Sequence, residues 1–434
     1  PTHPLLLLKR AVPWDTLTEV MTRHWRQHGK NVDGGPGLPW DVSLYVPLVV
    51  LMLIKAFDSR QMEAYLAENV VARVFIGRQH APQAQMRDHS NIARAYAALG
   101  KAGIDEVNHL VIKEAHRFGF VDEGSLSADT TAQELPIGYP NEPGILRGLA
   151  QRCGRALTQM KQRGIAGLAS ALDQVQTILR SVKEHHLFTS GKADKRQVLI
   201  RILREVGELM VQTRPLLQRL ETSADAVIQR ARSRLMAMHE VIKPLMGQMV
   251  HWIATGKVAA NKIVHVGIPQ ARAIVRNKAG KKTEFGLAYL ISRLGGGYLW
   301  GERIVADADE RLMPLKALAG YQAIFGQEAT PELVVYDRGG DSTPTRQQLA
   351  LAGVKDVGIQ PKGNRPWSVA EAVREQIRSE RGRTEGSIGT LKSNRYKFNK
   401  PKERLWPTLE MAGPRSILSF NLNKFMRDLV ALTQ

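Results

Sequence analysis

Residues 126–134 read LSADTTAQE, and this stretch decides the fold because it places an aspartate directly after a short apolar run. The pattern predicts a buried β-strand that ends near Asp129 and leads into a turn of small polar residues. A carboxylate near a sheet interior is costly unless it is paired or holds a metal ion. No basic residue stands beside Asp129, so its partners must come from elsewhere in the chain.

A second aspartate stands in the same setting. The run ELVVYD (332–337) is apolar up to Asp337, as expected for a central strand covered on both faces, and the turn-forming RGGDS follows it. Open α/β sheets place their ligands at the carboxyl ends of strands. We therefore expect Asp129 and Asp337, which are 208 residues apart, to meet in one site. Asp341 is interpreted as a turn former.

A third carboxylate is expected from a helix over residues 371–392, which offers Glu371, Glu375, Glu380 and Glu385. Glu385 is favoured because Gly386 and Gly389 keep the bulk around it low. Glu380 is its rival. At about 100° per residue the two side chains point about 140° apart, so only one of them can face the aspartates.

Three converging carboxylates, in a chain with a single cysteine, suit hard ions that prefer oxygen ligands, namely Mg²⁺ or Mn²⁺. Two such ions, roughly 3.5–4 Å apart, support in-line displacement at a phosphorus atom. The sequence thus predicts a two-metal phosphoryl-transfer site built on Asp129, Asp337 and Glu385.

The charge of the chain indicates a polyanionic partner. Lys and Arg outnumber Asp and Glu by 61 to 41, the formal net charge is +20 and the sequence pI is about 10.1. Nucleic acid is the default partner for such a protein, and a charge that only keeps the protein soluble is the alternative. The residues expected to contact DNA phosphates are Arg94, Lys278, Lys281, Lys282, Arg338, Arg374, Arg378, Arg381, Arg383, Lys392 and Arg395.

Two of these basic groups have a second interpretation. The helix over 371–392 is equally compatible with a solvated surface in which Glu371 pairs with Arg374 and Glu375 with Arg378. The basic segment KAGKKTEFG (278–286) is either a DNA contact or only a charged hairpin connection.

The order of helical and strand-like segments predicts an α/β domain split by a helical insertion. We expect an N-terminal helical DNA-binding domain (1–120), a catalytic domain (121–144 and 256–434) and a helical insertion (145–255). Helices over 91–100 and 104–120, joined by a glycine-containing turn, are compatible with a helix-turn-helix. Residues 121–143 are expected to form strand, turn and strand.

The compartment is expected to be the cytoplasm. Cys153 is the only cysteine, so no internal disulfide forms. The longest apolar run, LYVPLVVLMLI (44–54), is too short to span a bilayer. In PLLLLKR (4–10) the basic residues follow the apolar ones, the reverse of a signal peptide.

Several segments together resemble the DDE transposases of bacterial insertion sequences, most closely the ISNCY-type group. They are SADTTAQELPIGYPNEPGIL, KAGKKTEFG, VVYDRGGDS, RTEGSIGTLK and the closing SILSFNLNKF, in this order. The resemblance implies an RNase H-like fold, a mixed central sheet flanked by helices, with Asp129, Asp337 and Glu385 as the catalytic and metal-binding triad. It also implies Mg²⁺-dependent cleavage and strand transfer of double-stranded DNA by a protein associated with the bacterial nucleoid. A homodimer is expected because two DNA ends must be handled together.

Two other functions remain open at this stage. One is a related nuclease that cuts DNA without joining it. The other is a DNA-binding protein that has lost catalysis.

Overall fold

The computed structural model describes residues 3–33, 40–80, 88–278, 281–305, 308–363, 365–367, 369–403 and 405–434, with the side chains of 276–282 excepted. Two compact units make up the chain. The first joins Pro1–Glu134 to Ala288–Gln434, and the second is Leu135–Leu287.

The centre of the fold is a six-stranded mixed sheet in the order β2-β3-β1-β5-β6, with β4 also paired to β3. The strands are β1 (Asp122–Glu134), β2 (Arg272–Lys278), β3 (Lys281–Gly295), β4 (Leu299–Ile304), β5 (Leu333–Tyr336) and β6 (Asp356–Ile359). β1, β5 and β6 pair in parallel, whereas β2/β3 and β3/β4 are antiparallel. The predicted mixed α/β class, with helices flanking the sheet, is confirmed.

Two strand predictions are wrong. Residues 135–141 form no strand, so β1 has no hairpin partner directly after it. The alternating apolar and polar residues of KIVHVGIPQARAIVRN (262–277) also predict a strand, but that strand begins only at Arg272. Turn residues and short alternation explain the two errors, because neither separates a strand from an extended loop.

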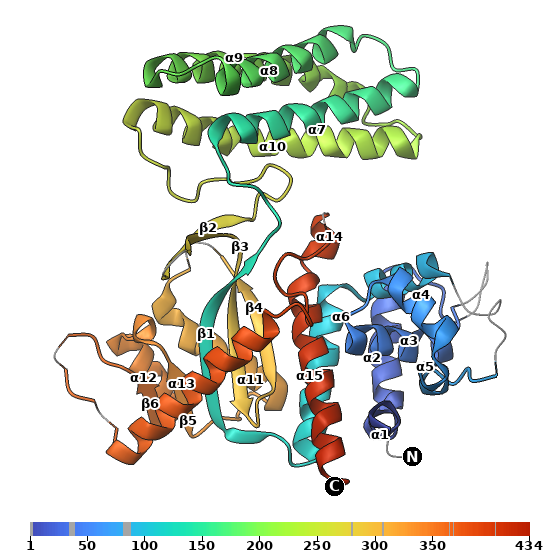
Figure 1. Ribbon diagram of the computed structural model, residues 1–434, viewed down its shortest axis with the longest axis vertical. Helices are drawn as coiled ribbons and strands as arrows, with labels where there is room; N and C mark the ends of the chain where they lie inside the picture. Colours follow the sequence, from blue (N-terminus) through green and yellow to red (C-terminus); the bar gives the residue numbers. More distant parts are fainter. Residues whose placement is uncertain are drawn as a thin grey trace. The chain divides into compact units, whose positions relative to one another are not determined.

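Each face of the sheet is covered by its own helices. α13 (Glu371–Leu391) lies across β1 on one face, and α11 (Met313–Phe325) packs on the other face (Figure 1). Alternate side chains of β5 point to these two faces. Leu333 and Val335 pack with Ile377 of α13, whereas Val334 and Tyr336 belong to the large core on the opposite face. β5 is therefore buried on both faces, as its apolar sequence predicted.

The N-terminal helices share that large core with the sheet. They are α1 (Pro4–Ala11), α2 (Trp14–Gln27), α3 (Val42–Lys55), α4 (Ser59–Glu68), α5 (Val70–Phe75) and α6 (His89–Arg117). α6 contains a break at Gly100, where φ is 68° and ψ is 175°, so it is two helical segments that meet there. The break lies just before the predicted turn at residues 101–103.

Within the described residues no single helix is long and apolar enough to cross a membrane. Only α3 and α4 taken together reach the length and composition of a span, and a bend of 102° separates them.

The second unit is built on four helices with a core of their own. They are α7 (Glu142–Gln162), α8 (Ala169–Leu187), α9 (Lys192–Arg219) and α10 (Ala226–Thr255). Leu149, Cys153, Ile202 and Leu235 are among the buried residues of this core. At the base of the unit the Leu135 N–H donates to the Phe285 carbonyl (2.9 Å), so the segments that enter and leave it are hydrogen-bonded to each other.

Helix α15 (Ala412–Ala431) is fixed to the sheet by a buried asparagine. Asn421 accepts a hydrogen bond from the Leu299 N–H (2.9 Å) and donates to the Leu299 carbonyl and to Asn108 Oδ1 (2.8 Å). Asn108, on α6, donates to the same carbonyl (3.0 Å). One side chain thereby joins α6, β4 and α15.

We expect Asn421→Ala to lower the free energy of unfolding by at least about 2 kcal/mol, because each buried polar group left without a partner costs about 1–3 kcal/mol. Urea denaturation measures the change. The exposed Arg427 on the same helix provides the control, since Arg427→Ala is expected to stay within about 0.5 kcal/mol of wild type. Equal effects of the two substitutions would contradict the prediction.

Candidate active site on two neighbouring parallel strands

The two predicted aspartates follow a pair of facing residues on adjacent strands. β1 and β5 pair with Ser127 opposite Val335, and Asp129 and Asp337 each come two residues after that pair in the sequence. Side chains two residues apart on a strand share a face. Asp129 is therefore on the face that α13 covers, as Ser127 is, whereas Asp337 comes directly after the end of β5. β1 runs on to Glu134, so the predicted turn after Asp129 is wrong and this aspartate lies inside the strand.

Asp337 is fixed by the turn that follows it. Its side chain caps the short 3-10 helix η3 (Arg338–Gly340), and the Gly339 N–H donates to Asp337 Oδ1 (2.8 Å). Gly339 is tightly covered by a second carboxylate, because a Cβ built there would lie 2.3 Å from the carboxyl carbon of Glu310. A larger residue at position 339 would have to displace the end of the Glu310 side chain.

The pKa of Tyr336 indicates that a further acidic residue lies near the two aspartates. Burial raises the pKa of Tyr336, and the negative charges of Asp337, Glu310 and Asp129 raise it further. Asp337, Glu310 and Asp129 thus all lie near enough to Tyr336 for their charges to act on it. Glu310 escaped sequence reasoning because it follows no apolar strand. It begins the 3-10 helix η2 (Glu310–Leu312) and reaches the site through the folding of that loop.

Helix α13 is positioned against β1 by a buried hydrogen bond. Thr384 Oγ1 donates to Ser127 Oγ (2.7 Å), which is two residues from Asp129 on β1. Glu385 is the next residue of α13, is exposed to solvent and forms no ion pair with any described residue. The predicted third carboxylate therefore lies on the helix that crosses β1 beside the aspartates.

The rival residue Glu380 has a different role. It is 5% exposed, and its two carboxylate oxygens accept hydrogen bonds from Arg293 on β3 (2.7 Å) and from Arg383 (2.7 Å). This buried ion pair joins α13 to the sheet. Both carboxylate oxygens of Glu380 are thus engaged by arginines, whereas the side chain of Glu385 is exposed.

Asp129, Asp337 and Glu385 have the donor atoms that a divalent cation prefers, but they are not close enough together to form a complete metal site. In the described part of the chain no three His, Cys, Asp or Glu side chains are placed to hold a metal ion. Carboxylate oxygens are nevertheless the donors that Mg²⁺ and Mn²⁺ prefer. By donor type, Asp129, Asp337 and Glu385 fit such an ion.

Asp341, interpreted as a turn former, is a buried anchor for the loop beyond η3. Its carboxylate accepts hydrogen bonds from Arg346 (2.9 Å), Arg365 (2.5 Å) and the Lys362 N–H (2.7 Å). Burial disfavours the charged form, but these donors outweigh it and lower the pKa of Asp341. This aspartate is fully engaged in structural bonds.

Several of the predicted DNA-contacting arginines pair within their own helix. Arg374 donates to Glu371 (2.9 Å), and Arg378 lies 3.5 Å from the same glutamate. Arg383 binds Glu380, as described above. The ion pairs of a solvated helix therefore account for part of the charge on α13, although the pair Glu371–Arg378 replaces the expected Glu375–Arg378.

The remaining predicted DNA contacts are scattered. Arg395 donates to Asn423 (2.7 Å) on α15, Arg94 and Arg338 are exposed, and Arg381 and Lys392 are half-buried. The side chains of Lys278, Lys281 and Lys282 lie outside the described residues. Lys278 ends β2 and Lys281 begins β3, and these two strands pair antiparallel.

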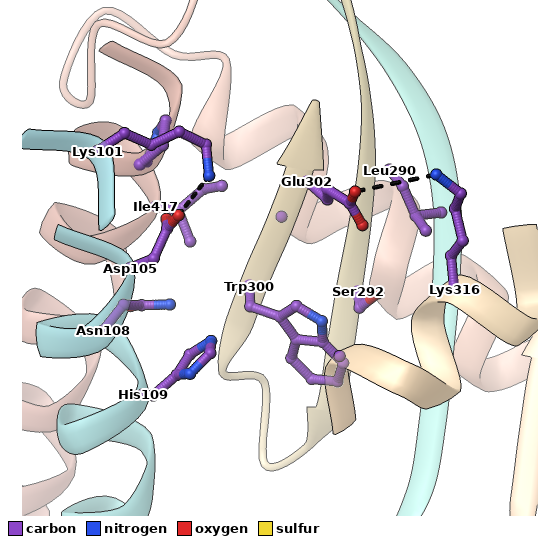
Figure 2. A pocket seen from close by; sticks show the side chains of 13 residues that line it. Lys101, Asp105, Asn108, His109, Leu290, Ser292, Trp300, Glu302, Lys316 and Ile417 are labelled. Atoms are coloured by element: carbon purple, nitrogen blue, oxygen red, sulfur yellow. Dashed lines mark hydrogen bonds and ion pairs between the residues drawn. The ribbon is translucent and has the colours of Figure 1, made fainter. Parts of the chain in front are cut away.

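A cavity of about 170 Å³ lies on the opposite face of the sheet. Ser292 lines it, whereas the next residue, Arg293, reaches α13 on the other face. Figure 2 shows Asn108 and His109 projecting from α6 toward Trp300 of β4. None of Asp129, Asp337 and Glu385 lines this cavity.

Two titratable groups of this cavity are shifted by burial. Burial raises the pKa of Asp105, although the adjacent Lys101 opposes the shift. Burial also lowers the pKa of His109, and the positive charges of Lys113 and Lys101 add to the effect. Both shifts favour the neutral forms of these side chains.

No family model, curated protein or solved structure matches the chain. The site is therefore interpreted from its own residues and contacts.

We expect Glu380→Gln to lower the free energy of unfolding by about 3–5 kcal/mol, because it leaves the Arg293 guanidinium buried without a counter-charge. Glu385→Gln is the matched control on the same helix and is expected to change stability by less than about 0.5 kcal/mol. Thermal and urea unfolding test both. A destabilised Glu385→Gln protein would show that Glu385 is a structural residue.

We expect the stability of the protein to depend on pH through the ionisation of Asp105. Because its folded pKa is raised, Asp105 binds a proton more readily in the folded state, and this favourable contribution is lost as pH rises through the folded pKa. The melting temperature of Asp105→Asn, relative to wild type, should therefore be higher at pH 7 than at pH 3.5. A difference that is the same at both pH values would refute this assignment.

Proposed function

We propose that the protein is a DDE-type transposase that cuts and joins double-stranded DNA by metal-dependent phosphoryl transfer. The observation that carries the proposal is the register of β1 and β5, in which Asp129 and Asp337 each follow the pair Ser127–Val335 by two residues. Enzymes of many classes bind ligands at the strand ends of parallel sheets, but paired aspartates beside an exposed glutamate suit hard cations and phosphate chemistry.

The order of the strands supports the RNase H-like fold that the sequence resemblance implies. β4, β3 and β1 are successive neighbours and lead into the parallel strands β5 and β6. α11 precedes β5, α12 (Thr343–Leu351) precedes β6, and α13 follows β6 and returns across β1. In this interpretation β2 is an addition at the sheet edge, and the helical unit is inserted after the first strand.

The proposed roles follow from the contacts. Asp129 and Asp337 would hold the ions together with Glu385, and bound Mg²⁺ or Mn²⁺ would activate a hydroxyl nucleophile and neutralise the developing charge. Gly339 keeps the Asp337 carboxylate oriented through its N–H. The Thr384–Ser127 hydrogen bond keeps α13, and with it Glu385, next to β1.

The partner is proposed to be DNA because the chain carries a formal charge of +20. A polyanion of high charge density binds such a protein through release of its counterions. Handling two transposon ends at once would require two active sites, and a homodimer supplies them.

A DNA-binding protein without catalysis is the second candidate, and one observation favours it. The described acidic residues do not form a ready metal site. Glu310 is a further carboxylate beside Gly339, close to Asp337, and is therefore included in the test of the enzyme.

The test is nicking of supercoiled plasmid in Mg²⁺ or Mn²⁺. We expect Asp129→Asn, Asp337→Asn and Glu385→Gln each to reduce the rate by at least about 100-fold, the cost typical of removing one group that stabilises charge in a transition state. Loss of activity in Glu310→Gln with activity retained in Glu385→Gln would move the third ligand to Glu310.

DNA binding by the same variants is the control. Variants that bind DNA as wild type does but fail to nick it support the triad. Wild-type protein that binds DNA but nicks neither plasmid nor its own element ends, with either metal, would favour the binding protein. Nicked products that are never joined to a target would favour a nuclease.

A further inference from the structure

The positive charge of the chain is concentrated in the second unit. Residues 135–287 contain 25 Lys and Arg against 10 Asp and Glu, a net charge of +15 of the total +20. The other unit has nearly twice as many residues but carries only +5. The strongest attraction for a polyanion is therefore expected at the helical unit, whereas most of the residues predicted from sequence to contact DNA belong to the other unit.

Three arginines meet where α7 lies along α10. Arg152 and Arg155 are one turn apart on α7, and Arg234 comes from α10. Arg234 Nη1 donates to Gln159 Oε1 (2.8 Å), one turn further along α7, which holds this arginine against the neighbouring helix. We call Arg152, Arg155 and Arg234 the arginine cluster.

Arg152 is the half-buried member of the cluster. Its guanidinium lies directly over the backbone of Gly267, where a Cβ would come within 1.8 Å of Nη2. Gly267 thus provides the space for the arginine. Arg155 and Arg234 are exposed, so the cluster opens to solvent.

The cluster has no compensating carboxylate among the described residues. Burial lowers the pKa of Arg152, and the positive charges of Arg155 and Arg234 lower it further. Other cations of the same unit are neutralised locally. Arg201 and Arg204 lie beside glutamates of α8 and α9, and Lys243 binds Glu240.

Mutual repulsion of three guanidinium groups is unfavourable in the free protein and is relieved by an anion. Guanidinium groups bind phosphate oxygens through paired N–H donors, so phosphate is the chemistry that fits. Further exposed cations on the same two helices add to the positive charge of the unit, which favours a polyanion with many phosphates over a small anion. They are Arg147, Lys161 and Arg230.

We propose that the arginine cluster of α7 and α10 binds phosphates of the double-stranded DNA backbone, so that the helical unit is a main DNA-binding surface of the protein. The choice of duplex DNA as the partner rests on the proposed function. Phosphate binding by the cluster does not depend on catalysis by the acidic residues.

The test measures binding of the full-length chain to a fluorescent duplex of arbitrary sequence in EDTA, over a series of salt concentrations. One variant carries Arg152→Gln, Arg155→Gln and Arg234→Gln. The matched control carries Arg201→Gln, Arg204→Gln and Lys243→Gln, the same change of charge in the same unit at cations that already have partners. A second variant with only Arg155→Gln and Arg234→Gln leaves the half-buried arginine in place.

We expect the cluster variant to bind at least about tenfold more weakly. The slope of log affinity against log salt should fall by about 2.7, because each phosphate that is no longer neutralised removes about 0.9. The double variant should reduce the slope by about 1.8. The control should keep both the slope and most of the affinity. Melting temperatures verify that each variant is folded.

Equal reductions of affinity in the cluster and control variants, or an unchanged salt slope, would overturn the proposal. So would wild-type protein that fails to bind duplex DNA at low salt. Tighter binding of single-stranded RNA than of duplex DNA would overturn the choice of partner. Plasmid nicking is measured separately, so an absence of nicking with a normal cluster effect would reject the proposed enzyme activity and leave this site standing.

Discussion

The parallel pairing of β1 with β5 is the constraint on which the rest of the structure depends. It brings together segments that lie about two hundred residues apart in sequence, and one residue of slippage would turn Asp129 to the wrong face. Contacts on both faces of the sheet fix this register. Leu126 and Val334 are buried in the large core, while Ser127 is bonded to Thr384 on α13. The acidic site is therefore a consequence of how the core is packed.

The two aspartates could be selected as candidate site residues from the sequence, because the composition of each surrounding segment indicates a buried strand. LVVYD is a buried strand by composition alone, and its aspartate ends it. The length of β1 beyond Asp129 was not predictable, because TTAQE remains a strand through pairing with distant segments. Glu310 was equally hidden. Its position beside Gly339 depends on two loops that meet in space and share no sequence signal.

The two groups of arginines differ in what neutralises them. On α13 the guanidinium groups of Arg374 and Arg383 already have glutamate partners, so DNA would have to compete with an existing ion pair. In the arginine cluster the neighbours are other arginines. Composition alone pointed to α13 as a DNA surface, because it counts charges and cannot see which charges are paired. Spatial partners decide which cations are available to an external anion.

The hydrogen bond between Leu135 and Phe285 gives the helical unit a closed base. A segment of more than one hundred residues therefore departs from the sheet and returns to it through neighbouring positions. The entropic cost of closing a loop rises only slowly with its length, and the two ends of this unit already lie side by side. Such a unit can therefore be acquired, lengthened or exchanged in evolution without a change in strand order. The helical unit can then diversify while the sheet and its acidic residues stay constant.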